Sequence, residues 1–192
     1  MSNLLTFSQQ QAIKKLSPNF NTAKFDLLDS EVEITDLKDL IGRALLQDLQ
    51  DNPATAANLL LLNGDTFTSY LGQPVKHKGI RFVLAYMNYS RYLGESFVQD
   101  TYSGMVQKQN DTSERVGEGT IKRLQLSSQE IALSEFELIK EYLTINSTTY
   151  PLWLAGTSRK TFTPVFGSVS KTAYGSEVNS RCEYNGKRYI ND

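Results

Sequence analysis

The stretch that decides the fold is Gly79-Ile80-Arg81-Phe82-Val83-Leu84-Ala85-Tyr86-Met87-Asn88-Tyr89-Ser90-Arg91-Tyr92-Leu93-Gly94. On a helix, its apolar residues share one wide sector, made of Phe82, Tyr86, Tyr89 and Leu93 beside Ile80, Val83 and Met87. The opposite side then carries the polar residues His77, Lys78, Arg81, Asn88, Arg91 and Glu95. A helix with so wide an apolar sector contacts more than one neighbour. Residues 77–94 are therefore expected to form the central helix of a packed bundle.

Two shorter helices are expected before the central one. The first covers residues 36–50, with Thr35 as its N-cap and an apolar stripe that ends before Asn52. The second covers residues 54–62, with Pro53 as its first residue. Its four consecutive leucines predict burial on several sides, and a loop with Gly72 and Pro74 leads on to the central helix.

After the central helix, residues 96–118 are rich in turn-forming residues and predict a long loop, with short strands near 97–98 and 105–107. A last helix is expected over residues 120–145. Its apolar face consists of Ile121, Leu124, Ser128, Ile131, Ala132, Phe136, Ile139, Tyr142 and Leu143. Leu126 and Leu133 interrupt the polar face, seven residues apart. They are either ordinary surface leucines or a contact with a neighbouring subunit.

The two ends of the chain lack a helical period. Residues 1–30 are polar and are expected to form an extended arm with one short helix over residues 8–16. Residues 154–192 are expected to form a C-terminal docking arm, because Asn185-Gly186 between strand-forming residues is a strong hairpin signal. The predicted fold is thus mainly α, a small bundle of about four helices in a core domain over residues 31–153, with an arm at each end.

Composition limits the chemistry that this chain can perform. Its 192 residues carry 20 Lys and Arg against 21 Asp and Glu, a formal charge of −1, which is untypical of a dedicated nucleic-acid binder. No apolar run approaches the roughly 20 residues that cross a bilayer. The single cysteine and the single histidine, Cys182 and His77, leave no internal disulfide and too few ligands for a structural zinc site. No metal or cofactor is expected.

The motifs that could carry catalysis are weak. Ser168 and Lys171 match a Ser-x-x-Lys motif without the companion motifs that a penicillin-binding enzyme has. Gly117-Glu118-Gly119 lacks the remaining residues of a phosphate-binding loop and is interpreted as the turn before a helix. His77 is expected to be a solvated residue near a helix end, and the glutamates of the last helix to be solvated surface charges. The sequence therefore predicts that the protein is not an enzyme.

The C-terminal arm combines apolar, aromatic and basic residues. Residues 159–192 hold six Lys and Arg against three Asp and Glu. The residues expected to dock on a partner are Phe162, Val165, Phe166, Val169, Tyr174, Tyr184 and Tyr189. The basic residues Lys160, Lys171, Arg181 and Arg188 either contact DNA phosphates or help the arm to bind a protein surface.

The order of these elements resembles a known family. The motifs are a Gly-x-x-x-x-x-Ala-Tyr-x-x-Tyr-x-Arg-Tyr-Leu helix over residues 79–93, a Thr-x-x-Gly-x-Val loop over 101–106, the pair Ser113-Glu114, a long helix and a Tyr-x-x-Trp ending at 150–153. Over roughly residues 35–153 the chain resembles the head-to-tail connector (adaptor) proteins of tailed bacteriophages, above all those of crAss-like and other Bacteroidetes phages.

The resemblance implies a structural virion protein without catalytic residues or cofactors. Such adaptors form a homo-oligomeric ring, generally of twelve copies, beneath the portal protein at the virion neck. The ring extends the DNA channel, lets DNA pass without sequence specificity and docks other neck or tail proteins. The protein would be made in the cytoplasm of the host bacterium and would have no membrane partner. The alternatives are a DNA-binding or packaging accessory protein, another neck ring such as a stopper or tail terminator, and a hydrolase of surface glycans.

Overall fold

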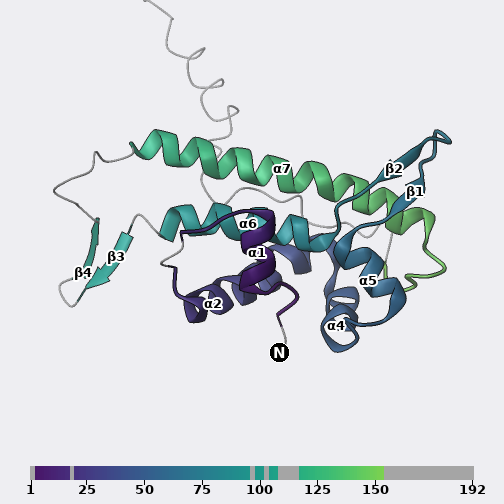
Figure 1. Cartoon of the computed structure of the whole chain (residues 1–192), viewed down its shortest axis with the longest axis horizontal. Helices are drawn as coiled ribbons and strands as arrows, with labels where there is room; N and C mark the ends of the chain where they lie inside the picture. Colours follow the sequence, from purple (N-terminus) through teal and green to yellow (C-terminus); the bar gives the residue numbers. More distant parts are fainter. Residues whose placement is uncertain (1–2, 18–19, 96–97, 102–103, 108–116, 154–192) are drawn as a thin grey trace, which may run out of the picture. The chain divides into compact units, whose positions relative to one another are not determined.

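A computed structural model describes residues 3–17, 20–95, 98–101, 104–107 and 117–153. In segments 98–101 and 104–107 it describes only the backbone. These residues form a mainly helical fold, as the sequence predicts (Figure 1). They all belong to one unit, which runs from Met1 to Phe162. The predicted C-terminal arm over residues 154–192, with its hairpin, lies outside the described residues.

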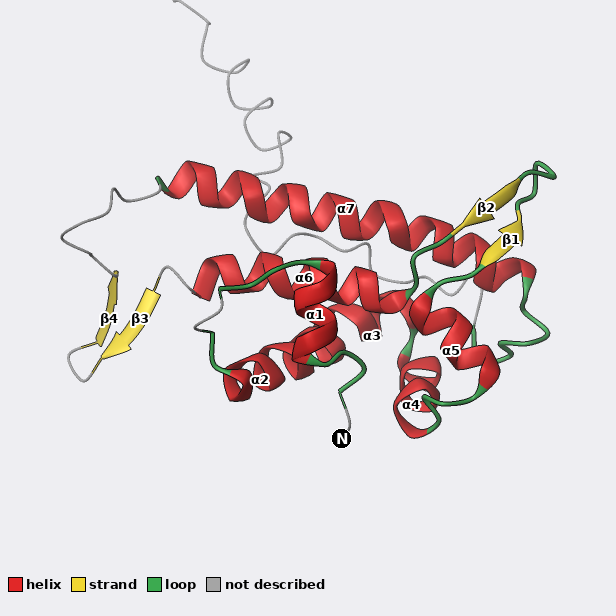
Figure 2. Ribbon diagram, in the orientation of Figure 1, coloured by secondary structure: helices red, strands yellow, loops and turns green. Residues whose placement is uncertain are grey.

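The two longest helices, α6 (Ile80–Glu95) and α7 (Glu118–Ile145), run side by side along the molecule (Figure 2). Both helices lie close to their predicted ranges. At one end of the contact, the Ser90 hydroxyl donates to the Gln125 carbonyl at 3.2 Å, and the Gln125 amide donates back to the Ser90 carbonyl at 3.1 Å. At the other end, the Lys78 backbone N–H donates to Glu135. The two helices are therefore antiparallel.

The prediction of an extended N-terminal arm is wrong for the described residues. Helix α1 (Phe7–Ile13) begins with a capping box at Thr6, and α2 (Thr22–Val32) begins at the N-cap Asn21. Both helices pack into the bundle, since Leu4, Leu5, Leu16 and Phe25 are buried in the same hydrophobic core as α6 and α7. Their few apolar residues are too widely scattered to give a helical period, so the sequence signal was weak.

The predicted helix over residues 36–50 has a different start. Helix α2 continues without a cap through the π-helical turn η1 (Glu33–Leu37) into α3 (Lys38–Ile41), and Thr35 is no N-cap. The Thr35 hydroxyl instead donates to the Glu31 carbonyl at 2.7 Å, as a threonine inside a helix does. Gly42, at a φ of 84°, then separates α3 from α4 (Arg43–Asp51).

Helix α5 (Ala56–Asn63) begins at the N-cap Thr55, so Pro53 lies outside it, and it ends at Gly64. The prediction that this helix is buried on several sides is wrong. Leu61 and Leu62 are fully buried, whereas Leu59 and Leu60 are exposed. The reason is that α5 lies at the surface of the bundle and buries only the side that faces α6.

A hairpin stands where the sequence predicts only a loop with Gly72 and Pro74. Strand β1 (Thr66–Thr68) pairs antiparallel with β2 (Pro74–Lys76), with Phe67 opposite Val75. Phe67 is buried, and its ring packs against Tyr142 of α7 at 5.5 Å between centroids. A second hairpin, β3 (Val98–Thr101) with β4 (Gly104–Gln107), lies where short strands are predicted.

Two residues assigned to the polar side of the central helix are buried. His77 precedes α6, has no solvent exposure and lies with its ring 4.4 Å from that of Tyr142. Burial lowers the pKa of His77, so the ring is neutral at pH 7, and the prediction of a solvated residue near a helix end is wrong. Asn88 is buried because α2 covers that side of α6, and its amide donates to Asp29.

Two glycines bring the base of the first hairpin against α5. Gly64 has a φ of 98° and Gly79 a φ of 85°. A Cβ at Gly79 would overlap the Leu62 carbonyl, and one at Gly64 would overlap the His77 carbonyl. Gly72, at the turn of the hairpin, has a φ of 75°, but a Cβ added there would meet no other atom within 4 Å.

We expect Gly79→Ala to destabilise the fold much more than Gly72→Ala. Both substitutions carry the cost of a left-handed backbone, about 1–2 kcal/mol. Only Gly79→Ala adds a steric overlap with backbone atoms, for a total of at least about 3 kcal/mol. Urea unfolding followed by circular dichroism measures both changes. Equal losses for the two variants would contradict this account of the hairpin base.

Candidate assembly surface

One side of α6 presents a line of aromatic rings. Phe82, Tyr86 and Tyr89 are only half-buried, and their spacing of four and three residues places them along one edge of the helix. The Lys14 ammonium of α1 lies 4.5 Å from the Tyr89 ring centroid, and that of Lys78 lies 4.3 Å from the Phe82 centroid. Cations over ring faces leave the outer edges of the rings open to a partner.

Phe82 and Lys78 line two clefts, one on each side of this edge. The α1–α6 cleft, about 220 Å³ in volume, lies between α1 and the start of α6, and its other lining residues are Gln9, Ala12, Ile13, Leu62, Asn63 and Arg81. The α6–α7 cleft, about 350 Å³, is formed with Ser127, Glu130, Ile131, Ser134 and Glu135 of α7. The first has the more apolar walls, and both are open to solvent.

Helix α7 carries an apolar stripe that nothing in the described part of the chain covers completely. Leu124, Ile131 and Ile145 are 42%, 42% and 38% exposed, and Leu138 between them is half-buried. Each follows the last by seven residues, which places the four along one line about 32 Å long. We call these four residues the α7 stripe. Ile131 belongs both to this stripe and to the α6–α7 cleft.

The prediction that Leu124 and Ile131 belong to the core face of the last helix is therefore wrong. The buried face is rotated away from them, toward α6, and consists of Gln125, Ser128, Ala132, Glu135, Phe136, Ile139, Tyr142 and Leu143. This rotation turns Gln125 toward α6, where its side-chain amide is buried and donates a hydrogen bond to the Ser90 carbonyl. A polar residue that is buried because it hydrogen-bonds to the backbone of another helix does not appear in a pattern of apolar residues. The sequence pattern therefore could not show that Gln125 faces the core.

The turn between β1 and β2 presents two more apolar side chains. Tyr70 is 68% exposed and Leu71 is 88% exposed, and the turn lies at the end of the hairpin, beyond β1 and β2, in Figure 2. The Tyr70 N–H donates to the Glu141 carboxylate at 3.0 Å, which fixes the turn to α7. We call Tyr70 and Leu71 the hairpin tip.

Leu126 and Leu133, the predicted subunit contact, do not form one exposed patch. Leu126 is 41% exposed, whereas Leu133 is half-buried against the core. Both lie on a different side of α7 from the α7 stripe. Their role in a subunit contact stays a prediction.

The other predicted site residues lie outside the described residues. They are the docking residues Phe162, Val165, Phe166, Val169, Tyr174, Tyr184 and Tyr189 and the basic residues Lys160, Lys171, Arg181 and Arg188. Ser168 of the Ser-x-x-Lys motif also falls there. Gly117 is the N-cap of α7, as its interpretation as a turn before a helix predicts.

Sequence reasoning missed the α7 stripe and the hairpin tip. The seven-residue spacing of Leu124, Ile131, Leu138 and Ile145 was a usable signal, because an unbroken heptad line is typical of a helix that packs against another helix. The hairpin tip gave little signal, since strands of three residues are too short for a period.

A metal ion is held by a cluster of ligating side chains. Within the ranges that the structure describes, no three His, Cys, Asp or Glu residues gather as a metal site would require. Glu137 of α7 forms a surface ion pair with Lys140 at 3.0 Å. Every helix in the described part of the chain is too short or too polar to span a bilayer.

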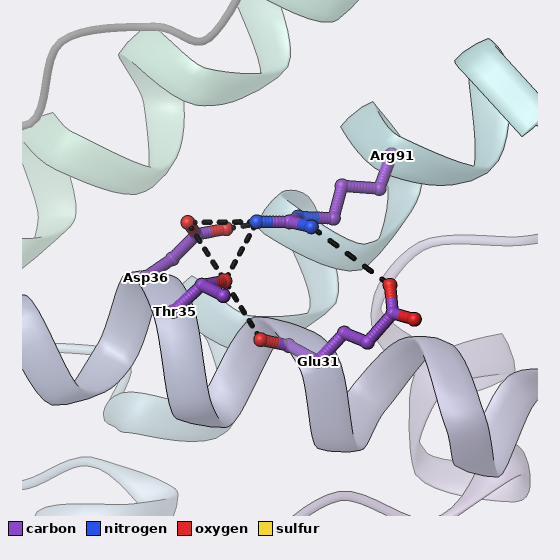
Figure 3. Close-up of polar contacts among 4 residues, drawn as sticks. All are labelled: Glu31, Thr35, Asp36 and Arg91. Atoms are coloured by element: carbon purple, nitrogen blue, oxygen red, sulfur yellow. Dashed lines mark hydrogen bonds and ion pairs between the residues drawn. The ribbon is translucent and has the colours of Figure 1, made fainter.

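Arg91 joins α6 to the π-helical turn through a group of polar contacts (Figure 3). Its guanidinium donates to both oxygens of the Asp36 carboxylate, at 3.1 and 2.9 Å, and to the Thr35 hydroxyl at 2.6 Å. A third nitrogen lies 4.0 Å from the Glu31 carboxylate. Two parallel bonds to a largely buried carboxylate fix both partners in orientation as well as in distance. Arg91 thus sets the position of α6, and with it the aromatic edge.

A second polar pair is fully buried between α2 and α6. The Asn88 amide donates to the Asp29 carboxyl group at 2.7 Å, and neither residue has any exposure. The pKa of Asp29 is raised to about 7, chiefly by burial and also by the neighbouring Glu33 and Asp26, against the lowering effect of the Asn88 and Leu5 bonds. Burial also raises the pKa of Glu33, which accepts the Leu4 N–H at 2.6 Å and the Gln50 amide at 2.7 Å.

We expect stability to fall as the pH rises from the ordinary Asp29 pKa of 3.8 to about 7. In that window the unfolded chain has lost the Asp29 proton while the folded chain still holds it, so folding is penalised by up to about 1.4 kcal/mol per pH unit. Above that window the penalty is constant. Asp29→Asn keeps the acceptor for Asn88 without the charge, so it should be more stable than the wild type above pH 7 and have a shallower slope.

Urea unfolding across this pH range measures the slope. Asp39→Asn, an exposed change on α3 at a residue that does not act on Asp29, is the control and should retain the wild-type slope. Glu33 should leave a residual slope in the Asp29 variant, since its pKa is also raised. A full wild-type slope in Asp29→Asn would contradict a buried, protonated Asp29.

Comparison with known proteins gives one family and no characterised relative. No curated protein matches the chain. No solved structure matches it either. Residues 37–163, more than half of the chain, match a family of unknown function. This range contains α6, α7, the α7 stripe, the hairpin tip and the α6–α7 cleft, whereas Gln9, Ala12 and Ile13 of the α1–α6 cleft lie before it. The chain is a member of the family of unknown function DUF6712.

Proposed function

We propose that this protein is a structural subunit of a ring in the neck of a tailed bacteriophage, a head-to-tail connector beneath the portal protein. The proposal combines the sequence resemblance with one structural observation, the α7 stripe. Four large aliphatic residues along 32 Å of one helix, three of them more than a third exposed, are a surface that a partner helix fits.

The placement of the stripe supports a contact between copies. It borders the α6–α7 cleft, which extends the apolar surface from Ile131 to Phe82. Ser127 and Ser134 line this cleft together with Ile131, and their small side chains let a second helix approach closely. A contact in which the neighbouring copy uses a different surface closes into a ring when the rotation allows.

The charge of the chain supports the channel role. A formal charge of −1 gives little attraction to DNA phosphates, so DNA can slide through a ring of such subunits. The portal protein and other neck or tail proteins are the proposed partners, and the virion neck is the proposed location. Residues 154–192, with six basic residues after position 158, are the proposed segment for docking on these partners.

We expect Ile131→Glu to prevent assembly and Leu126→Glu to permit it. The two positions have almost equal exposure, 42% and 41%, on the same helix, so they form a matched pair. A charge at Ile131 would be desolvated in the proposed contact, whereas one at Leu126 would stay in water. Light scattering after gel filtration, with and without the portal protein of the same phage, measures the mass.

The wild type should form a ring, or join the portal in stoichiometric copies. Assembly lost in Leu126→Glu but kept in Ile131→Glu would move the contact to the surface that the sequence predicts, around Leu126 and Leu133. A wild-type monomer that ignores the portal and binds DNA in a salt-dependent manner would contradict the connector proposal and favour the packaging accessory.

A further inference from the structure

We infer that the hairpin tip of one copy inserts into the α1–α6 cleft of the next copy. This inference rests on the proposed ring and assigns it a specific contact. Leu71, at 88% exposure, is the most exposed large hydrophobic residue in the described part of the chain, and Tyr70 beside it is 68% exposed. Two such neighbours on a projecting turn form a compact apolar knob.

The knob is held in a defined position. The Ser69 N–H donates to the Gln73 carbonyl and the Gly72 N–H to the Ser69 carbonyl, both at 2.9 Å, so the turn is closed. Glu141 of α7 accepts the Tyr70 N–H, and Phe67 anchors β1 in the core. A knob that is already ordered loses little conformational freedom when it binds.

The α1–α6 cleft matches the knob in size and polarity. Ala12, Ile13, Leu62 and Phe82 give it an apolar wall, and its volume is about 220 Å³. An apolar cavity of about 150 Å³ holds a benzene molecule, so this cleft has room for a leucine or a tyrosine ring. Gln9 and Asn63 at its margin offer hydrogen bonds to a tyrosine hydroxyl.

The cleft of the same copy is out of reach of its own hairpin tip. Leu62, Asn63 and Lys78 line the cleft and also flank the base of the hairpin. From Asp65, the hairpin extends five residues to Tyr70, about 16 Å at the rise of a strand. The tip and the cleft are thus at opposite ends of one rigid element, and the occupant of the cleft is a second copy.

Charge complementarity supports this occupant. Glu141 bonds the backbone of the hairpin tip, whereas Lys78 and Arg81 lie at the margin of the cleft. Insertion of the tip would bring this carboxylate toward these two cations. Contacts of opposite charge at the margin of an interface favour the correct orientation.

The knob is too small to hold a dimer by itself. A buried tyrosine contributes roughly 150–250 Å² and a stable interface buries about 800 Å² on each partner, so the tip supplies only part of the required area. In a ring the same contact recurs at every interface, beside the α7 stripe, and closure makes the set cooperative. The contact is also heterologous, because tip and cleft are different surfaces.

Cysteine crosslinking tests the contact on the full chain with Cys182→Ser as background. Leu71→Cys and Ala12→Cys, made as separate proteins, should form a disulfide-linked dimer only when mixed and oxidised. Both changes in one chain should give a ladder of linked copies. The pair Thr68→Cys with Ala12→Cys, with the cysteine on an exposed strand position, is the control and should give no ladder.

Leu71→Asp supplies the second measurement. It should raise the protein concentration at half-assembly at least tenfold, as expected for a residue central to an interface, and leave the circular dichroism spectrum unchanged. Disulfide formation between two Leu71→Cys chains alone would indicate a two-fold contact and overturn the inference. If the wild type forms rings, Leu71→Asp does not weaken them and Leu71→Cys does not crosslink to Ala12→Cys, the inference about the hairpin tip is overturned. The connector proposal would still stand in that case. Crosslinks without rings or portal binding would support the contact and contradict the connector.

Discussion

The close antiparallel contact between α6 and α7 is the constraint on which the rest of the structure depends. Ser90 and Gln125 exchange hydrogen bonds through their side chains and backbones, and a Cβ at Gly94 would collide with the Gln125 amide. Only small residues on α6 permit this approach. Because Gln125 is buried against α6, α7 is rotated so that the α7 stripe faces outward, away from the core. One polar contact inside the bundle thus decides which apolar residues remain on its surface.

The remaining elements pack around this pair and hold α6 by polar bonds. Arg91 ties α6 to Thr35 and Asp36, and Asn88 ties it to Asp29. Buried polar groups of this kind contribute modestly to net stability when they are bonded and cost much when one partner is lost. They also fix orientation, which apolar packing alone does less well. In the proposed ring, a subunit that presents two surfaces at set angles to its neighbours would gain from such fixed geometry.

The sequence predicted the parts of this fold that carry a long and regular period. Residues of α6 and α7 repeat their apolar positions over four turns or more, and both helices were found close to their real bounds. Helix α1 was predicted over residues 8–16, but α2 and the packing of both N-terminal helices were missed, because Leu4, Leu5 and Leu16 pack singly, without a repeat. Asp29, His77 and Asn88 were placed in solvent or left without a role, since a polar residue reveals burial only through a partner distant in the chain. On the surface, the seven-residue spacing of the α7 stripe can be seen in the sequence. Its exposure could not be predicted, because that depends on how α7 is rotated against α6.

The π-helical turn at Glu33–Leu37 fits an extra residue into an otherwise continuous helix. Removing one residue there would restore an ordinary α-helix, because the wider π-turn holds about one residue more per turn than an α-turn does. Phe25 on one side and Ile41 on the other would then still face the same core. Removing one residue from the α-helical turns on either side would instead rotate one of these residues by about 100° relative to the other. Among relatives of this chain, a one-residue gap in an alignment should therefore fall within these five positions and not in the flanking helices.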